Sequence, residues 1–288
     1  MVKNLTLKIG DINLSFSIEN PEDLVTLRVF YHDFLVSEGK PDIEIEICDE
    51  YLPDIKNWTT VFDSGGVWRL LSNNGQLAIC LSTPLIGPDP YQICILNNSF
   101  NRGVVYKRKI SSDLRVTPFD HPLMENIIVN ILARGKGTLV HGCAILDNGI
   151  GRLFMGKSGM GKSTMARLWA VSKGVTVLSD DRVIIRQNKD RFWMYGTPWH
   201  GEAGFSSPNT VPVDKIYFIR HSNRNEAQLL KTFDAISRAL INSFPTFWNT
   251  SGMEFTIDFF ADLCNEIPCY DLGFQPEPEV LGFLRCLD

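Results

Sequence analysis

The sequence has no long hydrophobic run. None of its 288 residues falls in a stretch approaching the roughly 20 consecutive apolar residues that a membrane-spanning helix requires. The opening residues, Met-Val-Lys-Asn-Leu-Thr, alternate in polarity and lack the apolar segment of a signal peptide. We therefore expect a protein without a membrane partner, located in the cytoplasm.

Cysteine shows neither pairing nor a ligand pattern. The seven cysteines are odd in number and contain no Cys-x-x-Cys pair. This predicts neither a disulfide framework nor a zinc site. We expect free thiols, because an unpaired cysteine behaves as a small hydrophobic residue.

An excess of positive charge is also missing. The chain has 28 Lys and Arg against 33 Asp and Glu, for a net charge of −5. Nucleic-acid binding usually needs a basic face, so we expect no nucleic-acid partner. The 44% hydrophobic content is ordinary for a globular protein, and the length allows one large domain or two modest ones.

The first part of the chain is rich in predicted strands. Apolar residues alternate with polar ones over 5–9, 14–18 and 43–47, the pattern of half-buried strands. Residues 68–81 predict a hairpin, because Asn74-Gly75 suits a tight primed turn. A helical stripe over Pro21–Val36 predicts one helix among these strands.

A domain boundary is expected within residues 111–120, which gives a strand-rich module over 1–118 and a second domain over 119–288. A helix should follow, with Asp120 as its cap and Pro122 in its first turn. Beyond Thr138, strands alternate with helices, so the fold class is α/β with an α+β leaning. The expected strands are 139–146, 152–155, 175–178, 182–186, 191–195 and 215–220, and the expected helices are 162–173 and 233–244.

The segment 156–164, here called the glycine loop, carries the strongest motif. Gly156-Lys-Ser-Gly-Met-Gly-Lys-Ser163 fits G-x-x-x-x-G-K-[ST] between a predicted strand and a predicted helix. The three glycines permit positive φ angles and a close approach of the backbone to a phosphate. Successive N–H groups and the helix N-terminus can then hold the anion. The motif predicts ATP with Mg²⁺, and the predicted nucleotide-binding residues are Gly156, Lys157, Ser158, Gly159, Met160, Gly161, Lys162, Ser163 and Thr164.

Individual residues of this region have predicted roles. Lys162 can reach the β- and γ-phosphates, and the Ser163 hydroxyl can ligate Mg²⁺. Asp180 and Asp181 follow the apolar strand 175–178, where a carboxylate can hold the metal or accept a proton from an attacking hydroxyl. Neighbouring side chains on a strand point to opposite faces, so a turn is needed for both to serve one site. His141 lies on a largely apolar strand, where a histidine with a purely structural role is the commoner interpretation.

Three segments together resemble a known family. His141-Gly142, the glycine loop and Leu178-Ser-Asp-Asp-Arg-Val183 are similar in order and spacing to the catalytic domain of bacterial HPr kinase/phosphorylase, whose fold is shared with phosphoenolpyruvate carboxykinase. The resemblance covers about a third of the chain, 122–220. It implies that Asp181 accepts the proton of a substrate serine, that Asp180 supports it or the metal, and that His141 is an active-site residue.

The resemblance also implies a second metal-binding glutamate and a catalytic arginine. Glu202 is the candidate glutamate, and Arg220, Arg224 and Arg238 are the candidate arginines. The chain differs from HPr kinases at Thr164, where those enzymes usually have glutamate. It also differs in residues 1–118 and in its C-terminal tail. It looks more like HPr-kinase-related proteins found beside bacterial peptide-modification genes.

The expected activity is therefore transfer of the ATP γ-phosphoryl group to a Ser- or Thr-type hydroxyl of a peptide or protein. The strand-rich module would recognise that partner, for example by adding an extended peptide to a sheet edge. A non-catalytic or regulatory nucleotide-binding module, a simple ATPase and a carboxykinase acting on oxaloacetate are the alternatives. The sequence leaves homo-oligomerisation open.

Overall fold

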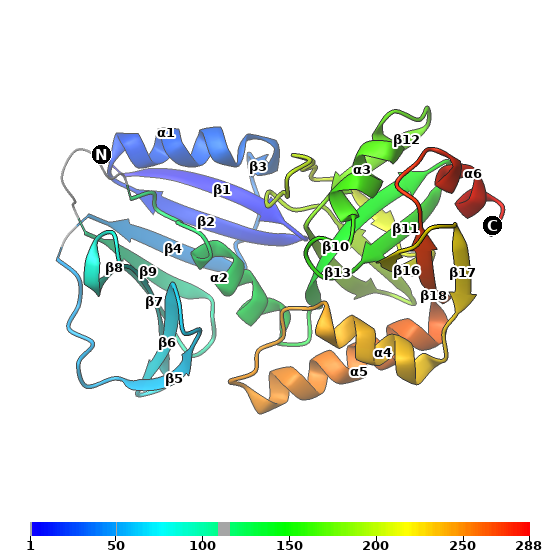
Figure 1. The fold of residues 1–288 in the computed structure, drawn as a ribbon. Helices are drawn as coiled ribbons and strands as arrows, with labels where there is room; N and C mark the ends of the chain where they lie inside the picture. Colours follow the sequence, from blue (N-terminus) through cyan, green and yellow to red (C-terminus); the bar gives the residue numbers. More distant parts are fainter. Residues whose placement is uncertain (1, 50, 109–115) are drawn as a thin grey trace. The chain divides into compact units, whose positions relative to one another are not determined.

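The structure is a computed structural model that describes residues 2–49, 51–108 and 116–288. The chain divides into two compact units, Met1–Ile131 and Leu132–Asp288, and each contains a large sheet (Figure 1). The mixed α/β class expected from the sequence is confirmed. The placement of a domain boundary at 118/119 stays a prediction, and residues 111–115 of the expected connecting segment lie outside the described residues.

The sheet of the first unit has the strand order β3-β1-β2-β4-β9-β8-β7-β6-β5. The pairs β2–β4 and β4–β9 are parallel, and the other neighbouring pairs are antiparallel. The strands are β1 (Lys3–Ile9), β2 (Ile12–Ile18), β3 (Leu35–Val36), β4 (Ile43–Cys48), β5 (Thr59–Asp63), β6 (Trp68–Asn73), β7 (Gln76–Thr83), β8 (Gly87–Leu96) and β9 (Arg102–Lys107).

The alternation in the sequence decides which face of this sheet is buried. In β4, every isoleucine is buried and both glutamates are exposed. The hairpin of β6 and β7 also forms as predicted, with positive φ angles of 47° at Asn74 and 78° at Gly75. These angles are the ones that a type I′ turn requires.

Helix α1 (Pro21–Phe30) is shorter than the predicted Pro21–Val36. The Asn20 side chain caps its start by accepting the Glu22 N–H. After Phe30 the chain tightens into the short 3₁₀ helix η1 (His32–Phe34), and β3 then pairs with β1. The predicted helical stripe therefore ends early, because Leu35 and Val36 join the sheet.

Helix α2 (Leu123–Leu132) forms where a helix was predicted. The backbone carbonyl of Asp120 accepts the Leu123 N–H at 2.7 Å. The Asp120 side chain accepts the Thr117 N–H at 3.0 Å, so its carboxylate holds the preceding turn. The helix position was right, whereas this use of the Asp120 carboxylate was not foreseen.

The sheet of the second unit has the order β15-β14-β13-β10-β11-β16-β18-β17, and β12 also pairs with β10. Strands β11, β16 and β18 are parallel neighbours, so their carboxyl ends meet at one edge. The strands are β10 (Thr138–Asp147), β11 (Ile150–Met155), β12 (Val175–Ser179), β13 (Arg182–Asn188), β14 (Arg191–Tyr195), β15 (Thr210–Pro212), β16 (Lys215–His221), β17 (Glu226–Leu229) and β18 (Cys269–Phe274).

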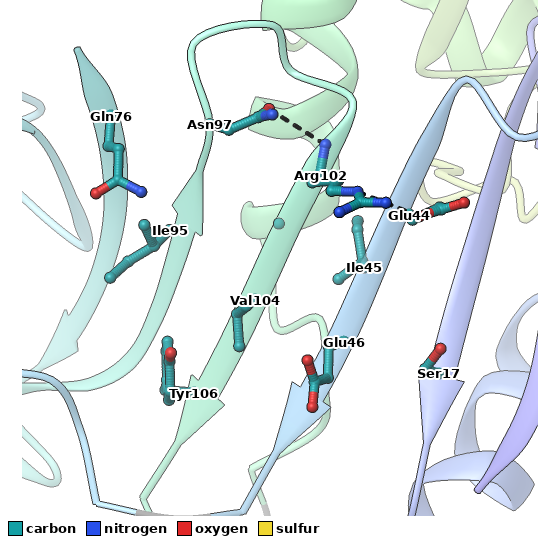
Figure 2. A pocket seen from close by; sticks show the side chains of 11 residues that line it. Ser17, Glu44, Ile45, Glu46, Gln76, Ile95, Asn97, Arg102, Val104 and Tyr106 are labelled. Atoms are coloured by element: carbon teal, nitrogen blue, oxygen red, sulfur yellow. Dashed lines mark hydrogen bonds and ion pairs between the residues drawn. The ribbon is translucent and has the colours of Figure 1, made fainter.

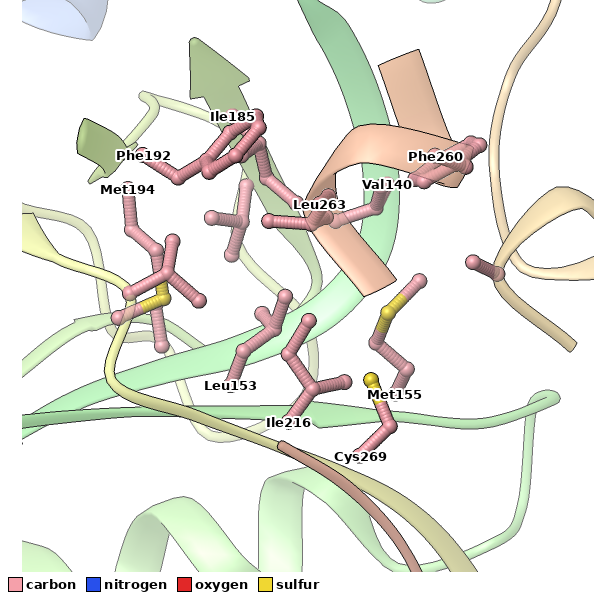
Figure 3. Close-up of a cluster of buried hydrophobic side chains, with 14 of the residues drawn as sticks. Val140, Leu153, Met155, Ile185, Phe192, Met194, Ile216, Phe260, Leu263 and Cys269 are labelled. Carbon is pink, nitrogen blue, oxygen red and sulfur yellow. The ribbon is translucent and has the colours of Figure 1, made fainter. Parts of the chain in front are cut away.

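Helices cover both faces of this second sheet. They are α3 (Lys162–Ala170), α4 (Thr232–Ile241), α5 (Thr250–Glu266) and α6 (Glu279–Arg285). On one face, Phe260 and Leu263 of α5 pack in a buried cluster with Leu153 and Ile216 of the sheet (Figure 3). On the other, Trp169 of α3 lies in a second cluster with side chains of α6. Full burial of one such side chain contributes about 2–3 kcal/mol.

Two helices of the second unit end before their predicted limits. Helix α3 stops at Ala170 instead of Lys173, because the Ser172 N–H closes a tight turn on Trp169. Helix α4 stops at Ile241 instead of Phe244, because the Phe244 N–H donates to Leu139 of β10. This second contact draws the 242–244 segment onto the sheet.

The structure also describes the state of the cysteines and the length and polarity of the helices. All seven cysteines are free, as expected. Within the described ranges, no helix is both long and apolar enough to cross a membrane.

Candidate functional site

The glycine loop connects the carboxyl end of β11 to the start of α3. Gly159 and Gly161 have positive φ angles of 81° and 100°, as expected for the motif. Gly156 does not have a positive φ, which corrects the prediction for that residue. Glycine leaves space there, because a Cβ on Gly156 would lie 3.0 Å from the Ile219 side chain, closer than side chains ordinarily pack.

Lys162 is the buried cation of the loop. It is the first residue of α3 and only 5% exposed. Its Nζ donates to the carbonyls of Gly156 at 2.8 Å and Lys157 at 3.1 Å. Burial lowers the pKa of Lys162 to about 8, although the charge of Asp181 opposes this shift. The hydrogen bonds of this buried ammonium group go to neutral carbonyl groups. It can exchange these hydrogen bonds for contacts with an anion.

The remaining loop residues form the rim and floor. Lys157 and Ser158 are exposed at the tip, whereas Met160 is partly buried against the core of the unit. Thr164 lies half-buried in the first turn of α3. The backbone N–H groups at the start of this helix lack intrahelical partners by geometry, which makes a helix N-terminus favourable to anions.

Ser163 and Asp180 are brought together by the fold. The Ser163 hydroxyl donates to Asp180 Oδ2 at 3.0 Å. Asp180 is almost fully buried, and its two oxygens also accept the N–H groups of Gly201, Ala203 and Phe205 at 2.9–3.2 Å. A hydroxyl beside a carboxylate offers the hard oxygen ligands that Mg²⁺ prefers, so this pair fits that metal.

Glu202 lies on the segment that Asp180 anchors. Its carbonyl accepts a hydrogen bond from Arg167 of α3 at 3.0 Å, and the residue is exposed. Across the described ranges, no group of three or more His, Cys, Asp and Glu side chains is arranged to hold a metal. A role for Glu202 as a metal ligand therefore stays a prediction.

Asp181 points into a cluster of cationic groups. His141 Nε2 lies 2.9 Å from its Oδ1, and an Arg182 nitrogen lies 2.7 Å from its Oδ2. Partial burial raises the pKa of Asp181. The hydrogen bond to His141 and the charges of Arg182, His141 and Lys162 outweigh that effect and bring the pKa below its ordinary value. The carboxylate is therefore ionised at neutral pH and can accept a hydrogen bond from a hydroxyl.

The two aspartates thus serve the same region in different ways. β12 ends at Ser179, and the bend over 180–181 turns Asp180 toward Ser163 and Asp181 toward His141. The Ser179 hydroxyl holds this bend by accepting the N–H groups of Asp181 and Arg182 at 3.3 and 3.1 Å. The alternation rule for strands does not apply here, because the chain turns.

Arg182 and Phe244 complete the cluster and were not predicted from the sequence. The Arg182 guanidinium lies 4.4 Å above the Phe244 ring, and the His141 ring lies 6.4 Å from the same ring. The position of Arg182 directly after the Asp-Asp pair was the available signal. Phe244 gave no signal, because the contact depends on how the end of α4 meets β10.

Strands β16 and β18 support the glycine loop from behind. A His221 ring nitrogen lies 2.9 Å from the Gly159 carbonyl. Phe274 packs so closely on Gly161 that a Cβ there would lie 2.7 Å from its ring. Sequence reasoning missed both residues, which come into contact with the loop only through the parallel pairing of β11, β16 and β18.

The three candidate arginines lie in a different ionic cluster. Arg220 and Arg238 both bind Asp271, at 2.9 and 2.5 Å. Arg220 and Arg224 both bind Glu226. Each of the three arginines is ion-paired with at least one of these two carboxylates, and the arginine that contacts Asp181 is Arg182. The assignment of a catalytic arginine to one of the three stays a prediction.

Together, these features describe a mixed α/β protein whose buried lysine, serine hydroxyl and two carboxylates surround one glycine loop. No family model matches the chain. Over 78 residues, the chain is 36% identical to the HPr kinase/phosphorylase of Mycoplasmopsis pulmonis, a match that covers 27% of this chain and 23% of that protein. The match confirms the resemblance to that family over this part of the chain, which spans less than a quarter of the relative.

A solved structure titled as the Hpr(Ser) kinase/phosphatase from Coxiella burnetii is also similar. The similarity covers 52% of this chain and 97% of that chain, with 12% sequence identity and a TM-score of 0.29. The substrate and activity of this chain are therefore matters for proposal.

Proposed function

We propose that the protein is an ATP- and Mg²⁺-dependent phosphotransferase that transfers the γ-phosphoryl group to a Ser- or Thr-type hydroxyl of a peptide or protein. The observation that carries the proposal is the arrangement of Lys162, the Ser163–Asp180 pair and the His141–Asp181 pair around the glycine loop. Phosphoryl transfer depends mainly on positioning and charge neutralisation, which such an arrangement supplies.

Each residue has a defined part in this proposal. The amides of the glycine loop and Lys162 bind the β- and γ-phosphates. Ser163 and Asp180 would hold Mg²⁺, which supplies positive charge next to the phosphate oxygens when bound. Asp181 accepts the proton of the attacking hydroxyl. The oxygen of that hydroxyl bonds to the γ-phosphorus, and the bond between this phosphorus and the ADP oxygen breaks. His141 and Arg182 hold the Asp181 carboxylate in place.

The same proposal extends to the family, the role of the first unit, the cellular location and the acceptor. The similarity to an HPr kinase/phosphorylase supports a kinase, and the motifs favour a fold of the HPr kinase and phosphoenolpyruvate carboxykinase type in the second unit. We assign acceptor recognition to the first unit and a cytoplasmic location to the protein. The acceptor would be a modified peptide or a protein rather than HPr itself.

Calorimetry with Mg·ATP on the full chain is the first test. We expect saturable binding. Asp181→Asn should bind Mg·ATP within about twofold of the unmodified protein, yet lose transfer by about 10²–10⁴-fold, the range for a general base. Asp190→Asn is the matched control, because Asp190 is exposed in the β13–β14 turn.

Mass spectrometry of a defined set of serine-containing peptides, incubated with protein and Mg·ATP, tests the transfer itself. A gain of one phosphoryl group supports the proposal. Release of inorganic phosphate with unmodified peptides would indicate an ATPase, and bound but intact ATP would indicate a regulatory module. Full activity of Asp181→Asn would rule out this residue as the proton acceptor, and absence of Mg·ATP binding by folded protein would overturn the whole assignment.

A further inference from the structure

The first unit has a cavity of about 530 Å³ on one face of its sheet. This volume falls within the range of ligand-binding sites. It lies across strands β2, β4, β9, β8 and β7 (Figure 2). Its lining includes Ser17, Glu44, Glu46, Ile95, Arg102 and Val104.

The period-2 alternation of the strands produces this lining. Glu44 and Glu46 of β4 point to the face opposite the buried isoleucines of the same strand. Glu46 pairs in register with Ser17 on one side and Val104 on the other. Val104 in turn pairs with Ile95 of β8. A hydroxyl, a carboxylate and an apolar strip therefore follow one another across the groove, as Figure 2 shows.

The charges in the groove are not balanced. Arg102 forms an ion pair with Glu44 at 3.5 Å, with both side chains largely exposed. Within the described residues, the Glu46 carboxylate forms no ion pair or hydrogen bond. One negative charge thus lies unmatched beside the apolar strip of Val104 and Ile95.

A side chain that complements this surface has an apolar stem and a positive end. Lysine and arginine fit this description, because their methylene groups cover apolar surface while the charge remains near water. Phosphate-bearing ligands are disfavoured by the two glutamates. An extended peptide presents alternate side chains about 7 Å apart on one face, which is the spacing of residues 44 and 46 along β4.

We infer that this groove binds an extended peptide segment in which a lysine or arginine lies two positions from apolar residues, on the same face of the segment. The basic side chain contacts Glu46, and the apolar neighbours pack on Val104 and Ile95. The inference rests on the proposed function in one respect, because the segment would belong to the phosphoryl acceptor. Binding itself requires neither nucleotide nor transfer.

Fluorescence anisotropy of the full chain without nucleotide tests the inference. The probes are two fluorescein-labelled peptides, Gly-Ser-Val-Ser-Lys-Ser-Val-Ser and the same sequence with glutamine in place of the lysine. We expect saturable binding of the lysine peptide and at least about fivefold weaker binding of the glutamine peptide. Glu46→Gln should weaken binding of the lysine peptide by about fivefold, the upper limit for an exposed ion pair. Glu46→Lys should weaken it further.

Glu38→Gln is the matched control, because Glu38 is exposed and does not line the groove. It should leave the affinity unchanged. Equal binding of the two peptides, or an affinity unaffected by Glu46→Lys, would overturn the inference and favour another surface such as the edge strand β5. Failure of transfer with intact peptide binding would contradict only the proposed function.

Discussion

The two ends of the β10–β11 hairpin both contain buried charge, yet they differ in how that charge is matched. At the end near the turn, Arg152 is fully buried and its guanidinium binds the carboxylates of Asp147 and Asp288 and the Tyr217 hydroxyl. At the other end, the hydrogen bonds of buried Lys162 go to two backbone carbonyls. Burial of a charge therefore does not by itself distinguish a structural cluster from a functional one.

The matching carboxylates make the difference. Arg285 and Lys215 also bind the aspartates of the Arg152 cluster, so every charge there has a fixed partner. Around the glycine loop, Lys162, Arg182 and His141 surround Asp181, and Asp180 is occupied by backbone N–H groups. Among the described residues, the hydrogen bonds of the Lys162 ammonium group go to backbone carbonyls and not to a carboxylate, and such a cation favours an incoming anion. The following predictions test this contrast.

Replacing Lys162 should have the largest effect. Lys162→Met removes the cation that contacts the phosphates, so transfer should fall by at least about 10³-fold and Mg·ATP affinity should weaken. The measurements are steady-state kinetics and calorimetry. The urea midpoint should change little, because no carboxylate of the described residues is hydrogen-bonded to the ammonium group that is removed. If transfer survives in Lys162→Met, the glycine loop is not required for the activity.

Replacing Arg152 should give the opposite result. Arg152→Met removes hydrogen bonds to Asp147, Asp288 and Tyr217, while Arg285 and Lys215 still bind the two aspartates. Loss of a hydrogen bond to a charged group lowers the free energy of unfolding by about 1.5–3 kcal/mol. Urea unfolding measures this change.

The control for Arg152 is Arg191→Met, because Arg191 forms a largely exposed ion pair with Asp214. That variant should change the free energy of unfolding by less than about 1 kcal/mol. Equal stability of Arg152→Met and the unmodified protein would show that the Arg152 cluster is not a structural element.

The Arg152 cluster should also make the free energy of unfolding depend on pH. Partial burial raises the pKa of Asp288, but its hydrogen bonds with Arg152 and Lys215 outweigh this and bring the pKa below the ordinary value of 3.8. A carboxylate with a lowered folded pKa stabilises the protein at pH values above its unfolded pKa, and that contribution is lost as the pH falls through the folded pKa. Asp288→Asn should therefore lower the urea midpoint at pH 7 and have a smaller effect near pH 3. A constant difference across this range would contradict the assignment.

The smallest effect is expected at His221. His221→Ala removes the contact with the Gly159 carbonyl, so the loop should lose part of its fixed geometry. We expect KM for Mg·ATP to rise by about fivefold, the equivalent of one ordinary hydrogen bond, with little change in kcat. His221→Gln, which can still donate, should recover most of the affinity. Loss of kcat with an unchanged KM would point to a different role.

Local patterns predicted those parts of the fold whose causes are local. The alternation in β1, β2 and β4 and the Asn74-Gly75 turn specify their structures over a few residues. Helix α5 (Thr250–Glu266) was not predicted, because Gly252 and Thr256 interrupt its apolar pattern. Its burial against the sheet depends on residues far away in the sequence.

The candidate site shows the same division. The motif residues 156–163 and the Asp180-Asp181 pair could be found from spacing, since the chemistry requires them close together in the chain. His221 and Phe244 could not, because their contacts are set by strand order and by the end of α4. The partners of Arg220 and Arg238 were likewise hidden, since Asp271 is more than thirty residues away.

Asp180 links the start of α3 to the loop that carries Glu202. One of its oxygens receives both the Ser163 hydroxyl and the Ala203 N–H. A cation that binds the Ser163 hydroxyl would remove one hydrogen bond from this Asp180 oxygen. The hydrogen bonds that anchor residues 201–205 would then change as well. Occupancy of a site beside Ser163 would therefore alter the hydrogen bonds that hold the segment carrying Glu202.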